Sequence, residues 1–304
     1  MLPPDNFDPE IGLAETLEPG LRRIVASNPS PMTYRGTNTY LLGQSEVAVI
    51  DPGPDSPAHL KAILAALQPG QRISHIIVTH THLDHSPLAR PLAARTGAEV
   101  WAFGNATAGR SPVMQGLAEA GLMGGGEGVD HGFRPDHSLA DGDMLEGNGW
   151  ALEVLHTPGH IGNHLCLAWG DACLTADHIM GWATSLVSPP DGDLTDFMTS
   201  CEKLGARNWR VFYPGHGAPV SDPNARLDWL VAHRRAREAS ILKALNAGPA
   251  TAEDLARVIY TETPAALLGA ATRNVLAHLV DLTGRGRVAP QGVLQAEAHF
   301  VLTS

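Results

Sequence analysis

The segment THTHLDHS, residues 79–86, decides the fold class of this chain. It overlaps the run HIIVTH at 75–80, whose β-branched apolar residues are typical of a buried strand. Four side chains that can bind metals fall within six residues: His80, His82, Asp84 and His85. Without a cation, such a group would be costly to desolvate and its imidazoles would repel one another's protons. The segment therefore predicts a metal site at the end of a strand.

The spacing within this segment predicts how the ligands divide. His80, His82 and Asp84 alternate, so in an extended chain they share one face. His85 must point elsewhere unless the chain turns at Ser86, where Ser–Pro favours the start of a helix. Such a turn would let the first two histidines serve one ion and the Asp–His pair serve another.

Three further segments, each after a strand-like run, supply the remaining candidates: TPGH (157–160), TAD (175–177) and PGHG (214–217). His160 and His216 follow Pro–Gly, where the chain bends sharply and can present a side chain. Asp177 ends a strand-like run, and its carboxylate could bridge two ions. Five histidines and two aspartates suit two transition-metal ions, with Zn²⁺ favoured and Mn²⁺ or Fe²⁺ as alternatives.

Strand-like and helix-like runs alternate around these segments, which predicts a mixed α/β (α+β) fold. The expected strands are 37–43, 46–51, 75–80, 151–156, 164–170, 171–177 and 210–217. The expected helices lie at 56–67, from Ser86 to a stop at Gly97, and at 194–204. Residues 104–149 are rich in Gly and Asp. We expect a long loop there, with one short helix near 112–121, that affects access to the site.

The character of the sequence changes at about residue 223. A long helix is expected over 225–248, where Gly–Pro ends it, and Thr251 with Asp254 caps a second helix. A third helix from Pro264 and two short strands around a turn follow. Three helices and a β-hairpin form a winged-helix pattern. We therefore predict two domains, residues 1–222 and residues 223–304.

The composition limits the classes of function. The net charge is −11, which gives no long-range attraction for nucleic acid. No apolar run reaches the roughly 18 residues that a membrane helix needs. Residues 1–12 lack the basic start and apolar stretch of a secretory signal, and the three cysteines lack metal-type spacing. These features favour a cytoplasmic protein that does not bind membranes.

THTHLDHS resembles the THxHxDH signature of the metallo-β-lactamase superfamily, and TPGH, the strand-end Asp177 and PGHG resemble its other ligand motifs in order. The resemblance spans about residues 25–220 and implies an αββα sandwich with a dinuclear site at one edge. It implies that one metal is bound by His80, His82 and His160. It implies that the other is bound by Asp84, His85 and His216, with Asp177 bridging. The family usually has Gly before the bridging aspartate, whereas this chain has Ala176.

A narrower resemblance covers nearly the whole chain. NPSPMTYRGTNTYLLG (28–43), PGHG and the tail resemble the β-lactamase-like protein 2 group, whose members carry a C-terminal winged-helix-like domain. It implies a phosphodiesterase, specifically an endoribonuclease, that cleaves single-stranded RNA with a hydroxide bridging two Zn²⁺ ions. Asp84 would orient that hydroxide or carry its proton. The same ligands serve glyoxalase II-like enzymes, so a thioester or lactone hydrolase is the alternative. The complete ligand set disfavours a non-catalytic interaction module.

Four more residues are candidates for supporting roles. Asp51, in DPG after a strand, resembles a family position that supports a histidine ligand through a hydrogen bond. Thr184 and Ser185 follow the candidate bridging aspartate closely and could donate hydrogen bonds to substrate. His164, four residues after His160, is expected to support the site, to contact substrate or to pack within a strand. The expected partners are RNA or a small ester or thioester substrate, and the sequence leaves a homodimer open.

Overall fold

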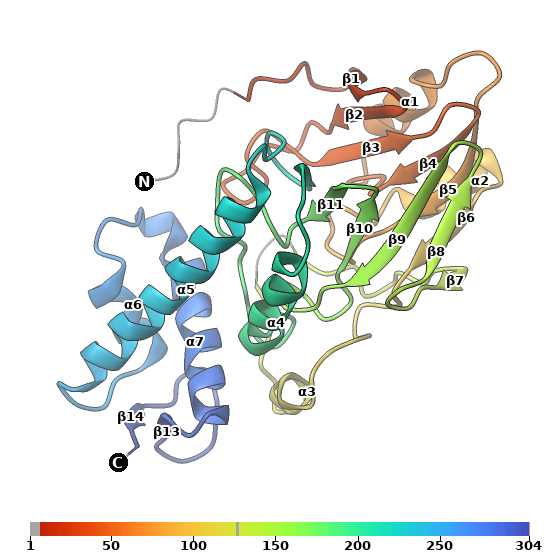
Figure 1. The fold of residues 1–304 in the computed structure, drawn as a ribbon. Coiled ribbons are helices and arrows are strands. Elements are labelled where there is room, and N and C mark those ends of the chain that lie inside the picture. Colours follow the sequence, from red (N-terminus) through yellow and green to blue (C-terminus); the bar gives the residue numbers. More distant parts are fainter. Residues whose placement is uncertain (1–6, 126–127, 304) are drawn as a thin grey trace.

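Two β-sheets pack face to face in the computed structural model, which describes residues 7–125 and 128–303 (Figure 1). Within these residues the first sheet has seven strands in chain order, antiparallel from β1 to β4 and parallel from β4 to β7. The strands of this sheet are β1 (Glu15–Glu18), β2 (Leu21–Val25), β3 (Asn38–Leu42), β4 (Glu46–Ile50), β5 (Arg72–Ile77), β6 (Glu99–Ala102) and β7 (His137–Ser138).

Five described strands form the second sheet, in the order β12-β11-β10-β9-β8. The pair β11 and β12 is parallel and the other neighbours are antiparallel. The strands of this sheet are β8 (Met144–Gly147), β9 (Trp150–His156), β10 (Leu165–Trp169), β11 (Ala172–Ala176) and β12 (Val211–Pro214). The facing sides of the two sheets bury one apolar core, in which Leu42 and Ile50 of the first sheet meet Leu167 and Tyr213 of the second.

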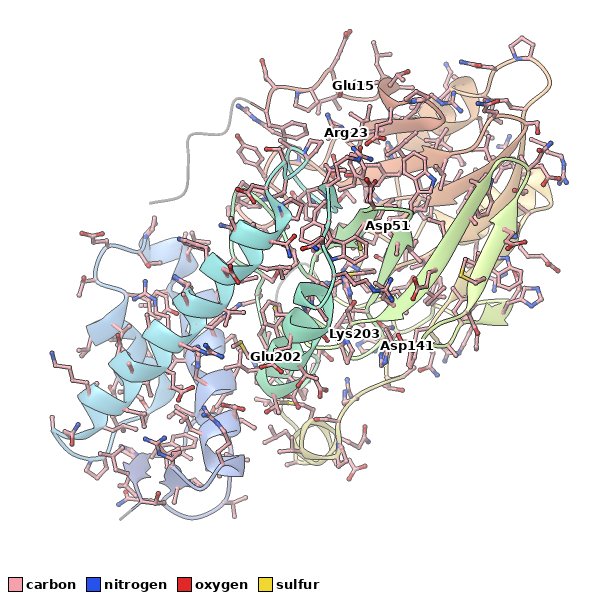
Figure 2. The ribbon with its side chains drawn as sticks, viewed as in Figure 1. Glu15, Arg23, Asp51, Asp141, Glu202 and Lys203 are labelled. Carbon is pink, nitrogen blue, oxygen red and sulfur yellow. The ribbon has the colours of Figure 1, made fainter. Side chains whose placement is uncertain are left out.

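Helices cover the outer faces of both sheets, which confirms the predicted αββα sandwich (Figure 1). The covering helices are α1 (Pro57–Ala65), α2 (Ala89–Thr96) and α4 (Leu194–Gly205). In the first outer layer, Ile63 of α1 and Leu92 of α2 belong to one buried cluster with strand residues. In the second, Phe197 of α4 packs with the second sheet. Lys203 of α4 also forms an ion pair with Asp141, just before β8 (Figure 2).

The C-terminal part contains the predicted three helices and hairpin. Its elements are α5 (Pro223–Leu245), α6 (Ala252–Ile259), the short 3-10 turn η1 (Ala265–Leu267), α7 (Leu268–Gly284), β13 (Val288–Pro290) and β14 (Phe300–Leu302). Thr251 and Asp254 form the expected capping box at the start of α6. These elements bury a core that also includes Met114 and Leu117 of α3 (Pro112–Glu119). In addition, Leu227 of α5 and Ala277 of α7 pack with α4 and the second sheet, so the two parts share a buried contact.

Three expectations about local structure need correction. The helix predicted from Ser86 begins at Ala89, because the Ser86 hydroxyl donates to the His82 carbonyl and to Asp130 instead of capping a helix. The segment 104–149 contains the expected helix, α3 (Pro112–Glu119), but it also supplies β7 and β8. The strands β1, β2 and β6 were not predicted.

The described part of segment 104–149 supports the loop that contains THTHLDHS (79–86). Leu83 N donates to Gly128 O at 3.0 Å and Asp130 N donates to Thr81 O at 2.8 Å, while Val129 forms an isolated bridge with His82. The segment thus holds THTHLDHS from one side. Among the described residues, no helix combines the length and apolar character needed to cross a membrane.

Candidate metal centre

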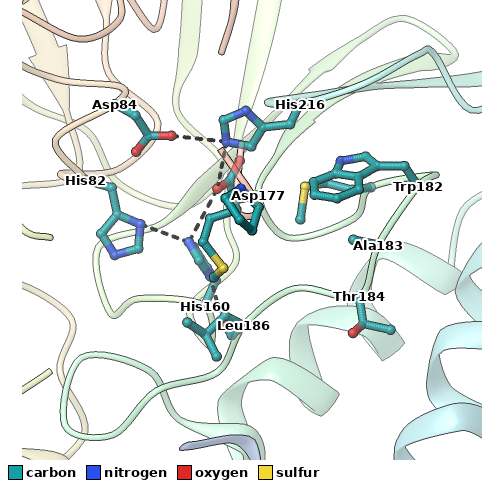
Figure 3. Close-up of a pocket in the computed structure, with 12 residues that line it drawn as sticks. His82, Asp84, His160, Asp177, Trp182, Ala183, Thr184, Leu186 and His216 are labelled. Atoms are coloured by element: carbon teal, nitrogen blue, oxygen red, sulfur yellow. Dashed lines mark hydrogen bonds and ion pairs between the residues drawn. The ribbon is translucent and has the colours of Figure 1, made fainter. Parts of the chain in front are cut away.

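All seven predicted ligands lie together where strands of the two sheets end, and Figure 3 shows five of them, His82, Asp84, His160, Asp177 and His216. The segment from His80 to His85 follows β5, His160 lies in the turn between β9 and β10, and the other two ligands directly follow β11 and β12. Every one of these side chains is buried. Their ligand atoms form two groups that share Asp177, and within each group the atoms lie within 4.8 Å of one another.

The first group contains His80, His82, His160 and Asp177. His82 Nδ1 lies 3.1 Å from His80 Nε2 and 3.0 Å from His160 Nε2. The Oδ2 atom of Asp177 lies 3.6 Å from the same nitrogen of His160 and 3.9 Å from that of His80. Four ligand atoms therefore surround one point.

The second group contains Asp84, His85, His216 and Asp177. His216 Nε2 lies 3.1 Å from Asp84 Oδ2 and 3.3 Å from Asp177 Oδ2. His85 Nε2 lies 3.3 Å from Asp84 Oδ2 and 3.4 Å from Asp177 Oδ1. Asp177 therefore faces both groups, as a bridging ligand must.

The donor set and its spacing fit two transition-metal ions. Ligand atoms at roughly 2.0–2.1 Å from a tetrahedral ion lie roughly 3.3–3.4 Å from one another, which is close to the separations in both groups. Asp84 Oδ1 is buried and has no hydrogen-bond partner in the part of the chain that the structure describes. A buried carboxylate oxygen without a partner is costly unless a cation compensates it.

The second nitrogen of each of four histidines is held by the protein. His85 Nδ1 donates to Asp51 Oδ2 at 2.9 Å, and Asp51 in turn accepts from Thr79 N and Oγ1. The Thr79 hydroxyl oxygen also lies 3.0 Å from His80 Nδ1. The remaining two histidines donate from Nδ1 to backbone carbonyls, His160 to Leu186 O at 2.7 Å and His216 to Gly36 O at 3.1 Å. Each contact fixes the ring with Nε2 directed at the cluster.

The two groups differ in their electrostatics. Burial, with repulsion from neighbouring imidazoles, lowers the pKa of His80 well below its usual value and that of His82 to about 3. Burial also disfavours charge on His216, but Asp177 and Asp84 outweigh it and raise the pKa to about 10. The surroundings of the first group thus favour neutral imidazoles, whereas the carboxylates of the second group favour a positive charge beside them. A cation in the second group would take the place of protons.

The four residues predicted to have supporting roles differ in how they contact the ligand cluster. Asp51 contacts His85 directly, as described above. Ser185 is buried and is not among the residues that line the pocket, and its hydroxyl donates to the carbonyls of Asp177 and His178. Thr184 lines the pocket in front of the ligands. His164 is buried behind His80, with ring centroids 5.2 Å apart, and its Nδ1 lies 2.9 Å from Thr157 Oγ1.

Apolar side chains form the walls of this pocket. Besides the ligands His82, Asp84, His160, Asp177 and His216, the lining residues are Pro31, Met32, Met180, Trp182, Ala183, Thr184 and Leu186. Within the described chain, no lysine or arginine lines this pocket. Trp182 stacks on Tyr34, with ring centroids 4.9 Å apart. The wall of the pocket therefore combines segment 180–186 with the segment around residues 31–34.

Comparison with known families identifies this arrangement. A model described as the Metallo-beta-lactamase superfamily matches residues 32–238, more than half of the chain, and this match includes all seven ligand candidates. The chain belongs to the metallo-beta-lactamase superfamily. It is therefore a hydrolase-family enzyme with a cluster that fits metal ions. A second model, described as the Beta-lactamase associated winged helix domain, matches residues 251–293 and confirms the winged-helix prediction.

Individual members of the metallo-beta-lactamase superfamily resemble the chain over most of its length. A Beta-lactamase-like protein 2 homolog of Drosophila melanogaster is 34% identical over 280 residues, which are 88% of each chain. An Atrochrysone carboxyl ACP thioesterase of Aspergillus fumigatus is 28% identical over 277 residues, 84% of this chain and 78% of that protein. A metallo-beta-lactamase family protein of Thermus thermophilus superimposes with a TM-score of 0.76 at 26% identity and covers 95% of this chain and 100% of its own.

Some supporting groups were not predicted from the sequence. Thr79 begins the signature segment, and its position before the first histidine was the available signal for its contact with Asp51. Gly36 and Leu186 contribute only backbone carbonyls. Because every residue has a carbonyl, the sequence contains no signal for these two contacts.

Proposed function

We propose that this protein is a dinuclear metal-dependent hydrolase of acyl thioesters or related esters. The observation that carries the proposal is the pocket, where apolar walls without a lysine or arginine among the described lining residues stand in front of the ligand cluster. An uncharged acyl group suits such walls, since apolar surfaces gain free energy by removing apolar atoms from water. The rest of a phosphodiester backbone, away from the two ions, would instead require cationic side chains or other strong donors.

The ligand residues would perform the chemistry as follows. His80, His82 and His160 would hold one ion, Asp84, His85 and His216 the other, and Asp177 would bridge them. Two cations there would supply Lewis acidity and a hydroxide nucleophile near neutral pH. Asp84 would orient the attacking water and accept its proton, because its Oδ1 is buried beside the pocket without a partner among described residues. We expect Zn²⁺, with Mn²⁺ or Fe²⁺ as alternatives.

The fungal relatives support this substrate class. Proteins named Atrochrysone carboxyl ACP thioesterase match 78% to 85% of this chain at 28% to 30% identity. Their name states thioester cleavage, a reaction in which water attacks an acyl carbonyl. The same attack would cleave a lactone, so lactones belong to the proposed substrate range. The predicted cytoplasmic location and homodimer stay predictions.

Cleavage of single-stranded RNA is the second candidate, supported by the whole-length likeness to Beta-lactamase-like protein 2 homologs. The arginines of the tail are largely engaged within the protein, however. Arg234 is buried, Arg273 donates to Pro189 O at 3.1 Å and to two further carbonyls, and Arg285 pairs with both Glu238 and Asp281. Few cations remain for an RNA backbone, so we rank RNA below acyl substrates.

A hydrolysis panel with zinc-loaded protein tests the proposal. The panel contains an acyl thioester, an aryl ester, an acyl-homoserine lactone and a single-stranded RNA. We expect turnover of the thioester or esters, and a loss of roughly 10²–10⁴-fold in Asp84→Asn, in line with removal of a general base. Asp228→Asn, which changes an exposed carboxylate on α5, should leave the rate unchanged. RNA cleavage with inert acyl substrates would overturn the proposal in favour of the second candidate.

A further inference from the structure

The segment from Asp177 to Val187 supports the candidate metal centre at two points. The Ser185 hydroxyl donates to the carbonyl of Asp177, and the Leu186 carbonyl accepts from His160 Nδ1 at 2.7 Å. The side chain of Leu186 also lines the pocket (Figure 3). The position of this one segment therefore sets the position of two candidate ligands and of part of the wall.

Residues of the C-terminal helices hold the backbone on both sides of Leu186. Arg234 of α5 donates to Ser185 O and, at 2.8 Å, to Asn274 Oδ1 of α7. The same Asn274 oxygen accepts from Val187 N at 3.2 Å. The two helices thus bind the carbonyl before Leu186 and the amide after it. Leu186 O, between these contacts, faces His160.

The burial of Arg234 indicates that these contacts are important. Arg234 is 3% exposed. Within the described chain, no carboxylate lies within ion-pair distance of its guanidinium. Burial lowers the pKa of this guanidinium, and it packs 5.0 Å from the centroid of the Phe197 ring. A buried cation without a counter-ion costs free energy. Its hydrogen bonds to Ser185 and Asn274 and its contact with the Phe197 ring offset part of that cost, while Nε has no hydrogen-bond partner among the described residues.

We propose that Arg234 and Asn274 are positioning residues for His160, acting through the Leu186 carbonyl, so that the C-terminal helices complete the metal centre. The proposal rests on the proposed role of His160 as a metal ligand. The Nδ1–H of this imidazole donates to the carbonyl, which fixes the tautomer whose Nε2 faces the ion. Loss of either supporting side chain frees the peptide groups around Leu186 and lets the imidazole turn.

Arg226 provides an informative comparison on the same helix. It donates to Met180 O at 2.8 Å and to Ala183 O at 2.7 Å, so it holds the earlier part of the same segment. Met180 and Ala183 line the pocket but do not contact His160 in any described hydrogen bond. Arg226→Met should therefore raise KM for the substrate, while zinc affinity stays within about twofold of the wild-type value.

The test measures the zinc affinities of the full-length protein by competition with a chromophoric chelator. We expect Arg234→Met and Asn274→Leu to weaken one of two bound ions roughly 10–100-fold, the usual effect of removing a group that orients a ligand. Asn274→Asp keeps the acceptor and should stay within about threefold of the wild type. Arg235→Met, at an exposed position next to Arg234, should bind both ions normally.

A double-mutant cycle assigns the weakened ion. Arg234→Met should cause no further loss in a His160→Ala background, but its full loss in a His216→Ala background. Unchanged zinc affinity in Arg234→Met, equal losses in both backgrounds, or an equal loss in Arg226→Met would overturn the inference. Wild-type protein that binds no zinc would instead contradict the proposed metal centre itself. Circular dichroism of the metal-free variants verifies that each one folds.

Discussion

Ala176 turns the chain at the end of β11. As a result, Asp177 faces the other candidate ligands and the following residue, His178, is buried. Its backbone φ is 41°, in the left-handed region. A residue with a Cβ atom adopts that region at a cost of roughly 1–2 kcal/mol, whereas glycine adopts it freely. This explains physically why the family usually has glycine before its bridging aspartate.

Ala176→Gly is expected to stabilise the protein by about 1 kcal/mol, since relief of the left-handed strain outweighs the greater entropy of the unfolded glycine chain. Urea unfolding of the metal-free protein measures the change. Ala172→Gly, at the regular start of the same strand, is the matched control and should destabilise by a similar amount. Equal losses of stability in both variants would contradict this account of position 176.

His278 of α7 is expected to make the protein sensitive to acid. It is 1% exposed, and neither ring nitrogen has a hydrogen-bond partner among the described residues. Burial, followed by repulsion from Arg234, lowers its pKa to about 3. The unfolded chain takes up a proton near pH 6.5 and the folded protein does not, so the contribution to stability is complete above pH 6.5 and declines as pH falls toward 3.

At pH 5 this difference amounts to about 2 kcal/mol of stability lost relative to neutral pH. His278→Leu should remove that loss, so its free energy of unfolding should fall less steeply between pH 7 and pH 5 than that of the wild type. Chemical denaturation at several pH values gives both curves. Parallel curves for the two proteins would show that His278 does not contribute.

At the scale of elements, tight turns place the ligands. Gly215, directly after β12, packs so closely that a Cβ atom there would lie 2.3 Å from Asp177 Oδ1 and 2.8 Å from His85 Cε1. Gly159, in the turn after β9, has a φ of 139° and would place a Cβ atom 2.3 Å from the Cα atom of Phe197 in α4. Both Pro–Gly–His turns thus need glycine for close approach, and the turn at Gly159 needs it for its backbone conformation as well.

Gly215→Ala should therefore displace two candidate ligands while the sheets stay intact. We expect zinc affinity to fall at least tenfold and hydrolytic activity with it, while the circular dichroism spectrum is unchanged. Gly116→Ala in α3 is the matched control, because a Cβ atom there would meet nothing within 4 Å. Normal zinc binding by Gly215→Ala would show that the turn has more room than the structure indicates.

The elements that the sequence predicted share a clear physical signal. Strands β3, β4 and β9 to β12 consist of apolar runs between turn residues, and three of the four ligand motifs follow β9, β11 and β12. Strand β2 was missed because Arg22 and Arg23 interrupt its apolar pattern. Both are nevertheless buried, and Arg22 donates to Gln71 Oε1 at 2.9 Å. Strand β8 was missed because it is short and lies in a Gly-rich segment, although it pairs with β9 as a local hairpin.

Some residues of the candidate site could be predicted from the sequence and others could not. Side chains in recurring motifs, such as His80 and His216, were found, and the structure brings them together. The role proposed for Arg234 was missed, although this residue follows Leu230 by four positions and so lies on the buried face of α5. Its partner, the Ser185 carbonyl, is a backbone group for which the sequence contains no signal. The predicted boundary at residue 222 stays a prediction.

At the scale of the molecule, the metal centre joins segments that are far apart in the chain. Ligands after β5, β9, β11 and β12 converge, and helices α5 and α7 support one of the segments between them. Bound ions should therefore stabilise the whole fold, because an ion that binds only the folded state adds about 2.7 kcal/mol at a hundredfold excess over Kd.

Chelation should accordingly lower the unfolding temperature by several degrees, and added zinc should restore it. Differential scanning calorimetry with and without chelator measures the shift. His160→Ala should show a smaller response than wild type, since one ion would already be lost. An unfolding temperature that changes with neither chelator nor zinc would indicate that the cluster does not bind metal in the folded protein.

The central claim is that seven side chains form two metal sites that share Asp177. Native mass spectrometry of the zinc-loaded protein, which counts ions per chain, tests it most directly. We predict two zinc ions for the wild type and one each for Asp84→Ala and His160→Ala. Wild-type protein that carries no zinc or one ion, or variants that still carry two, would contradict the account.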